Sequence, residues 1–156
     1  MYSFQNIIRF NSKHEFNTPV GVAGYSEDIK NRLLSFRVKA PDYELLNSDY
    51  THICWGDYPL DTVFYFDPPY YITSAAYNDG KRGMKGWGIT EEIEMLTILK
   101  QIDELGYKFM LSNVLEHKGK KHELLEKWIC ENHYRVIEAG VSGWRYAKNE
   151  VLIVNY

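Results

Sequence analysis

The 156-residue sequence has few cysteines and no long apolar run. Only Cys54 and Cys130 are present, without C-x-x-C spacing, so we expect two buried thiols and no disulfide. No two of the 5 histidines are spaced i, i+4, and they have no adjacent acidic ligand set, so no metal site is predicted. No stretch reaches the roughly 18 to 20 apolar residues of a membrane span, and the first residues do not resemble a signal peptide. These absences predict a cytoplasmic protein without membrane contact.

An excess of positive charge is also lacking. The composition, 45% hydrophobic and 25% charged residues, is typical of a soluble globular domain. The formal net charge of −3 is not typical of a dedicated nucleic-acid-binding module. Any contact with phosphate therefore depends on local clusters of lysine and arginine. There are three such clusters: Arg9 with Lys13, Lys81-Arg82 with Lys85, and Lys118 with Lys120-Lys121. Each cluster taken alone is more often solvated surface than binding site.

Short β-rich runs alternate with amphipathic segments, which predicts a single α/β domain over residues 1–156 with a mainly parallel sheet. Thr90 is the expected N-cap of the clearest helix, Glu91 and Glu92 suit its positive end, and Gly106 follows its C-terminus. We expect Asp103 to lie on the surface. The predicted strands are 51–55, 63–66, 107–112, 134–139 and 150–156, the last two forming a C-terminal β-hairpin, and the predicted helices are 26–36, 90–105 and 123–132.

The clearest chemical motif is Asp67-Pro68-Pro69-Tyr70, which directly follows the apolar run Val63 to Phe66. In open α/β sheets, ligands bind beyond the carboxyl ends of strands, where this motif falls. An amino group conjugated to an aromatic ring is a poor nucleophile, so a catalyst has to accept hydrogen bonds from its hydrogens. Asp67 supplies a charged acceptor, and the prolines leave the Pro68 carbonyl as a rigid second one. Tyr70 offers a flat face for stacking.

A glycine loop for a nucleotide-like cofactor is not found. Gly86-Trp87-Gly88 is the only G-x-G and precedes a predicted helix, but no strand leads into it. Tryptophan between the glycines would obstruct a close approach to the backbone. We therefore reject this segment as a cofactor loop.

Several segments in order resemble the catalytic part of Dam-like DNA adenine-N6 methyltransferases. Residues 64–70 are similar to the catalytic motif of that family, 8–11 with 15–21 to its DNA-facing region, 109–113 to its next strand, and 149–156 to its terminal strand. The resemblance implies a partial Rossmann-like methyltransferase sheet with flanking helices. It also implies S-adenosylmethionine-dependent methylation of adenine N6 in double-stranded DNA, in a Dam-like or restriction-modification setting.

The same resemblance implies roles for individual residues. Asp67, Pro68, Pro69 and Tyr70 would be catalytic, and Asp57, Tyr58 and Asp67 would contact S-adenosylmethionine. Residues 1–24 would be a remnant of the DNA-recognition region. The residues expected to contact DNA are Arg9, Asn11, Lys13, Asn17, Tyr71, Lys81, Arg82 and Lys85.

The sequence departs from that family in one respect, because the first strands and the glycine loop that hold the methyl donor are absent. We therefore expect a truncated product, one half of a split enzyme, or a part excised from a longer protein. An open sheet edge would favour self-association or binding of the missing N-terminal half. The alternative function is an inactive fragment that keeps only a DNA-binding surface. Methylation of RNA or of a protein glutamine is disfavoured by Asp67 and by the match over residues 9–21.

Overall fold

The computed structural model describes residues 11, 13–16, 26–73, 86–142 and 148–156. The chain divides into two compact units, Met1–Ile53 and Cys54–Tyr156. In the first unit, helix α1 (Glu27–Lys39) begins after Ser26, whose Oγ accepts the Ile29 N–H at 3.2 Å. The expected cap at Ser26 is therefore confirmed. The short 3-10 helices η2 (Ala40–Asp42) and η3 (Tyr50–His52) follow.

The strand predicted over residues 51–55 is wrong. The chain forms η3 and then a second 3-10 turn, η4 (Trp55–Asp57), instead. The reason is local, because the Asp49 carboxylate accepts both the backbone N–H of Thr51 at 3.1 Å and its hydroxyl at 2.7 Å. Such side-chain bonds offer the backbone an alternative to a strand ladder.

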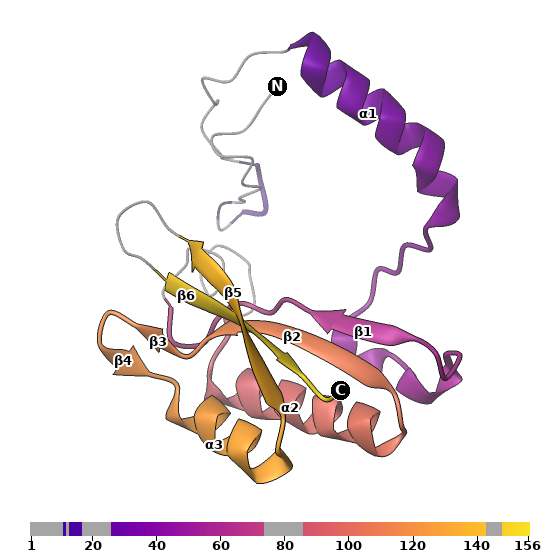
Figure 1. The fold of residues 1–156 in the computed structure, drawn as a ribbon. Coiled ribbons are helices and arrows are strands. Elements are labelled where there is room, and N and C mark those ends of the chain that lie inside the picture. Colours follow the sequence, from indigo (N-terminus) through magenta and orange to yellow (C-terminus); the bar gives the residue numbers. More distant parts are fainter. Residues whose placement is uncertain (1–10, 12, 17–25, 74–85, 143–147) are drawn as a thin grey trace. The chain divides into compact units, whose positions relative to one another are not determined.

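The second unit is built on a mixed sheet (Figure 1). Its strands are β1 (Val63–Phe66), β2 (Lys108–Val114), β5 (Arg135–Ser142) and β6 (Lys148–Val154), in the order β1-β2-β6-β5. β1 and β2 are parallel, whereas β6 is antiparallel to both β2 and β5. The predicted C-terminal hairpin is confirmed. The expectation of a mainly parallel sheet is wrong for the described strands, because the C-terminal strand returns between β2 and β5.

A small hairpin joins β2 to the last helix and was not predicted. Strand β3 (Glu116–His117) pairs with β4 (Lys120–Lys121) across a two-residue turn. Both turn residues have positive φ, 53° at Lys118 and 74° at Gly119, as a tight turn of the hairpin type requires. The turn places the third lysine cluster on one rigid element.

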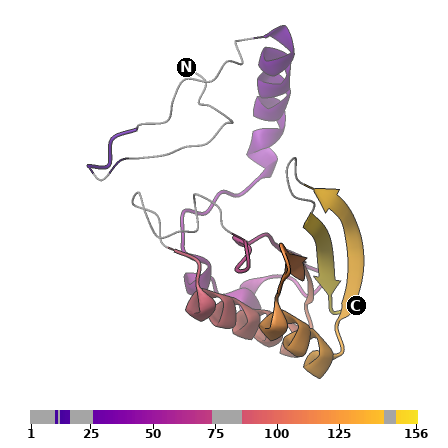
Figure 2. The ribbon, with the colours of Figure 1, turned by 90° about the vertical axis from the view of Figure 1, so that its left-hand side faces the viewer.

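Helices α2 (Ile89–Glu104) and α3 (Glu123–Asn132) lie side by side along one face of the sheet (Figures 1 and 2). Lys100 Nζ donates to Asn132 Oδ1 at 2.7 Å and links the two helices. Apolar side chains of both helices and of β2 and β6 form the core. The largest that are fully buried are Phe109, Met95, Leu99, Ile102, Leu111, Leu125 and Ile153.

The ends of α2 differ in how well they were predicted. The N-cap is Gly88, not Thr90, and Glu91 Oε2 accepts the Gly88 N–H at 2.9 Å. This reciprocal bond is half of a capping box and moves the start of the helix toward the N-terminus. Gly106 has φ +85°, so its expected place after the helix is confirmed.

Hydrogen bonds of the Asn155 side chain connect the C-terminus to the core. Asn155 accepts the Phe109 N–H at 2.8 Å and donates to Asp103 Oδ1 at 2.7 Å. Tyr134 donates its hydroxyl hydrogen to Asp103 Oδ2 at 2.9 Å. Burial raises the pKa of the Tyr134 phenol, and the bonded Asp103 carboxylate raises it further. Asp103 is thus a half-buried acceptor, and its expected surface role is wrong because two donors from other elements converge on it.

Both cysteines are free and exposed, so the expectation of buried thiols is wrong. Cys54 lies in the segment that turned out to be helical turns rather than a strand, and Cys130 lies on the outer side of α3. No helix in the described part of the chain is long and apolar enough to cross a membrane. In the same residues, β1 has no strand along its second edge, where Val63 and Tyr65 are 51% and 60% exposed.

Candidate active site at the carboxyl end of the first strand

The parallel register of β1 and β2 places Asp67 beside Ser112. Phe66 pairs with Leu111, so the chain leaves the sheet at Asp67 level with the next residue of β2. The Ser112 hydroxyl donates to Asp67 Oδ1 at 2.8 Å and lies 3.3 Å from the Phe66 carbonyl oxygen. Asp67 Oδ2 has no hydrogen-bond partner within the described ranges. One carboxylate oxygen is therefore fixed, and the other is available to a ligand.

The rest of the motif forms a half-buried turn. The Tyr70 carbonyl accepts both the backbone N–H and the hydroxyl of Thr73, each at 3.0 Å. The Pro68 carbonyl accepts no hydrogen bond from any residue that the structure describes. Because the two prolines have fixed φ angles and no N–H, the Pro68 carbonyl is held in place while its oxygen can still accept a hydrogen bond from a ligand.

The Tyr70 phenol is kept in its neutral form. Burial raises its pKa, and the nearby carboxylates of Glu150 and Asp67 raise it further, whereas its hydrogen bond with Ser112 lowers it. A neutral ring beside the Asp67 carboxylate can stack on an aromatic ligand without adding a second negative charge. Ser112 thus contacts both functional side chains of the motif.

The segment before β1 is fastened along that strand by aromatic contacts. The Trp55 ring lies 5.4 Å from Phe66 and 5.3 Å from Phe64, measured between centroids. The Tyr107 hydroxyl donates to the Tyr58 carbonyl at 2.7 Å. Asp57 is exposed at the end of η4. Trp55, at the start of η4, contacts Phe66, the residue directly before Asp67.

Behind the motif, Glu92 is the centre of a buried polar network. Its carboxylate accepts from the Trp87 indole at 2.7 Å and from the Asn113 amide at 3.4 Å, and it lies 2.9 Å from His122 Nε2. His122 Nδ1 accepts the Leu125 N–H at 3.3 Å, so the other ring nitrogen carries the proton that is donated to Glu92. Both Glu92 and His122 have side chains with 0% exposure. The network joins α2, β2 and the start of α3.

From the sequence, Glu92 was expected only to suit the positive end of the helix, and no role was predicted for Ser112 or His122. Those assignments missed contacts between residues 21 to 45 positions apart. Trp87 and Gly88 are used to bind Glu92 and to cap α2, which gives the Gly86-Trp87-Gly88 segment a structural task.

Comparison with known proteins identifies the family to which this site belongs. The family model for D12 class N6 adenine-specific DNA methyltransferases matches residues 1–141. The chain belongs to this methyltransferase family. It is 47% identical over 156 residues to the modification methylase LlaI of Lactococcus lactis subsp. lactis, covering 100% of this chain and 25% of the relative.

Two further relatives are similar to nearly the whole of this chain. Modification methylase StsI of Streptococcus sanguinis is 34% identical over 166 residues, and the type II methyltransferase M.FokI of Planomicrobium okeanokoites is 35% identical over 164 residues. Each match covers 99% of this chain and 25% of the relative. The chain thus spans about a quarter of the length of these curated relatives.

The residues of the methyltransferase that were expected to bind DNA are only partly described. Asn11 holds a local turn, since its Oδ1 accepts the N–H groups of Lys13 at 2.9 Å and Glu15 at 3.0 Å, and Lys13 is exposed. Tyr71 lies with its ring 5.4 Å from that of His122. Arg9, Asn17, Lys81, Arg82 and Lys85 lie outside the described residues. The DNA-binding role of these residues stays a prediction.

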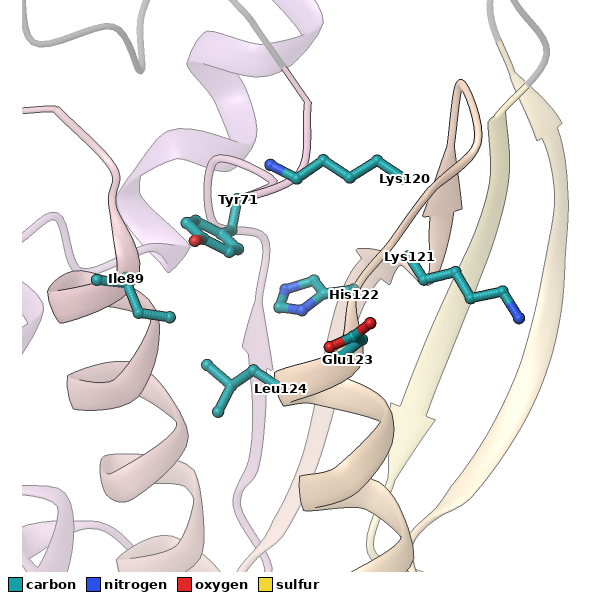
Figure 3. Close-up of a pocket in the computed structure, with 7 residues that line it drawn as sticks. All are labelled: Tyr71, Ile89, Lys120, Lys121, His122, Glu123 and Leu124. Atoms are coloured by element: carbon teal, nitrogen blue, oxygen red, sulfur yellow. The ribbon is translucent and has the colours of Figure 1, made fainter.

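A pocket of ≈ 390 Å³ opens beside the motif (Figure 3). Tyr71 follows the motif directly, Ile89 begins α2, and the remaining wall comes from β4 and the start of α3. Within the described residues, no group of three His, Cys, Asp or Glu side chains could hold a metal ion. The pocket is lined by Tyr71, Ile89, Lys120, Lys121, His122, Glu123 and Leu124.

Proposed function

We propose that this chain provides the catalytic motif for transfer of a methyl group from S-adenosylmethionine to N6 of adenine in double-stranded DNA. The observation that carries the proposal is the 2.8 Å hydrogen bond from Ser112 to Asp67 Oδ1, which leaves Oδ2 without a hydrogen bond to any described residue. The site lies at the carboxyl end of a parallel strand, where α/β sheets bind ligands. Membership of an N6 adenine-specific family supports the choice of acceptor.

In the proposed mechanism, Asp67 Oδ2 and the Pro68 carbonyl accept the two amino hydrogens of the target adenine. The amine lone pair is delocalised into the ring, so two fixed acceptors favour a pyramidal nitrogen whose lone pair points away from them. Sulfonium chemistry supplies the activated methyl group. As the N–C bond forms, the methyl–sulfur bond of the donor breaks, and its electron pair stays on sulfur in the neutral thioether that leaves. The nitrogen gains the positive charge, which the Asp67 carboxylate stabilises until one amino proton is released to solvent. Tyr70 stacks on the base after its extrusion from the duplex.

We propose Asp57, Tyr58 and Asp67 as the residues of this chain that hold S-adenosylmethionine. The exposed Asp57 carboxylate suits hydroxyl or amino donors, and the negative charges of Asp57 and Asp67 suit a sulfonium. These acceptors fit only part of that molecule, because the chain has no glycine loop for its methionine moiety. A second candidate function follows from this observation, namely a subunit or inactive fragment that retains a DNA-binding surface and requires a further part to bind the donor.

The remaining roles are proposed from the family resemblance. Residues 1–24 would belong to the DNA-recognition region of a catalytic domain over residues 1–156, acting in the cytoplasm within a restriction-modification system. The second edge of β1, which has no strand beside it among the described residues, would pair with a second copy or with a further part of a longer protein, because exposed strand edges template such pairing. The proposed DNA contacts are Arg9, Asn11, Lys13, Asn17, Tyr71, Lys81, Arg82 and Lys85.

The test measures labelled methyl transfer from S-adenosylmethionine to a duplex that contains adenine, and to the same duplex carrying N6-methyladenine. Asp67→Ala should reduce transfer by about 100-fold, the loss typical of a removed electrostatic stabiliser. Asp61→Asn, a change at an exposed carboxylate, serves as the matched control and should have no effect. Transfer that survives Asp67→Ala unchanged contradicts the mechanism. Calorimetric titration separates the second candidate, which predicts no heat with S-adenosylmethionine.

A further inference from the structure

The pocket beside the motif combines an aromatic wall with a positively charged rim. Its volume of ≈ 390 Å³ falls within the range of about 300 to 1,000 Å³ that ligand pockets occupy. Tyr71 forms one wall, and the apolar side chains of Ile89 and Leu124 lie opposite His122 in Figure 3. Aromatic and apolar walls with one cation suit a planar base that carries a phosphate.

The aromatic wall is held by the buried network behind it. The Tyr71 ring lies 5.4 Å from the ring of His122, at an interplanar angle of 52°. His122 is fixed on both sides, by Glu92 at 2.9 Å and by the Leu125 N–H at 3.3 Å. A base that stacks on Tyr71 therefore meets a platform whose support is already ordered.

The cation is Lys120. Its Nζ lies 5.2 Å from the centroid of the Tyr71 ring, and it forms no ion pair with any residue that the structure describes. Tyr71 is only half-buried, and a cation over a ring that solvent reaches is held weakly, so a phosphate can draw the ammonium away. Lys121 extends away from Tyr71, and Glu123 lies on the α3 side of His122 (Figure 3). Lys120 is therefore the cation best placed for a phosphate next to Tyr71.

We propose that this pocket is a second nucleotide subsite, which receives the nucleotide adjacent to the target adenine in the same strand. The base of that nucleotide stacks on Tyr71, and its phosphate binds Lys120. This inference rests on the proposed function, since Tyr71 follows Tyr70 directly and a strand with adenine at Tyr70 has its neighbour within reach. With a net charge of −3, the chain has to concentrate phosphate contacts in such local cations.

The experiment uses the full chain and duplexes in which 2-aminopurine replaces the base on one or the other flank of the adenine. Affinity is measured at several salt concentrations, and fluorescence reports stacking of the flanking base. Lys120→Gln should reduce the slope of log affinity against log salt by about 0.9, the value for one phosphate contact. Lys127→Gln, a change at an exposed lysine of α3 outside the pocket lining, is the control and should leave the slope unchanged. Tyr71→Leu should weaken binding by about tenfold and abolish quenching on one flank, whereas Tyr71→Phe should retain both.

The subsite is overturned if Lys120→Gln and Lys127→Gln change the slope equally, if quenching on both flanks persists in Tyr71→Leu, or if the unaltered chain binds no DNA. Thermal unfolding of each variant shows whether a loss reflects misfolding, and Tyr71→Phe keeps the test valid if Tyr71→Leu does not fold. Failure of the proposed function gives a different pattern. Binding that depends on Tyr71 and Lys120, without methyl transfer to adenine, supports the subsite and favours the second candidate function, a subunit that requires a further part to bind the donor.

Discussion

Replacing Ser112 by alanine should slow methyl transfer by about tenfold without unfolding the chain. Ser112 is buried on β2, and alanine fits in its place while removing the 2.8 Å hydrogen bond to Asp67 Oδ1. A hydrogen bond to a charged group contributes about 1.5 to 3 kcal/mol. Asp67 is exposed, so solvent reduces this value toward the lower end. A change of about 1.4 kcal/mol in the barrier corresponds to tenfold in rate.

The assay measures single-turnover transfer of labelled methyl to an adenine-containing duplex, together with the pKa of Tyr70 by carbon NMR of labelled tyrosine. The second measurement does not require catalysis. Because the hydrogen bond between Tyr70 and Ser112 lowers the pKa of the Tyr70 phenol, Ser112→Ala should raise that pKa further. Ser112→Thr retains a hydroxyl and should preserve both properties, and Ser48→Ala is a control at an exposed serine.

Two results would refute this reasoning about Ser112. An unchanged transfer rate in Ser112→Ala means that Asp67 is oriented by other contacts. An unchanged pKa of Tyr70 means that the hydroxyl does not couple the two side chains of the motif. A loss of rate that Ser112→Thr does not recover, with normal unfolding, assigns the effect to packing rather than to the hydrogen bond.

Three further changes test the framework around the site. Glu92→Gln should lower the free energy of unfolding by about 1 to 3 kcal/mol, measured with urea, because an amide cannot accept from all of its donors. Lys118→Asn should raise it by up to about 1 kcal/mol in the same assay, because asparagine tolerates the positive φ of 53° in this turn. In Tyr134→Phe, stability should fall less steeply as the pH rises above 10. Thermal unfolding at a series of pH values measures this. The raised pKa means that Tyr134 contributes stability below its ordinary value of 10.0, which is lost at higher pH.

A change of the same type at an exposed residue serves as the control for two of these variants. Glu126→Gln removes an exposed carboxylate and should leave stability unchanged, and Tyr43→Phe removes an exposed phenol and should leave the alkaline profile unchanged. Equal losses in Glu92→Gln and Glu126→Gln would contradict the buried network. If Lys118→Asn lowers the stability, the contacts of the lysine side chain contribute more than asparagine gains by tolerating the positive φ. An alkaline profile of Tyr134→Phe identical to that of the unaltered chain would contradict the raised pKa.

The elements predicted well are those whose signals are local. Residues 123–132 form a helix with the predicted bounds, because apolar positions recur at helical spacing between a cap and a break. The apolar run 63–66 forms β1 as predicted. Residues 51–55 have the same β-rich composition but fold into turns, since the Asp49 side chain captures Thr51. Composition alone does not distinguish these two segments.

The motif of the candidate site could be predicted from the sequence, but the residues that support it could not, and the catalytic role of the motif stays a prediction. Asp67 and its neighbours stand out because an unusual tetrapeptide follows an apolar strand. Ser112 and Glu92 carry no such signal, since a serine in a strand and a glutamate in the first turn of a helix are ordinary. Their roles arise from strand register and from the packing of α2 against β2, which depend on residues far apart in the sequence. Register therefore decides which polar side chain supports the motif.

The residues that support Asp67 and Tyr71 do not depend on the part of the site that would hold the methyl donor. Asp67 is oriented by Ser112 on β2 alone, and Tyr71 by His122 and the Glu92 network, all within Cys54–Tyr156. Neither support uses the second edge of β1, where no strand is paired among the described residues. Both of these supports thus lie within the second unit of the chain. A chain of this kind should recognise an extruded adenine even in the absence of the donor, and strands added at β1 would contribute to catalysis mainly by completing the site for S-adenosylmethionine.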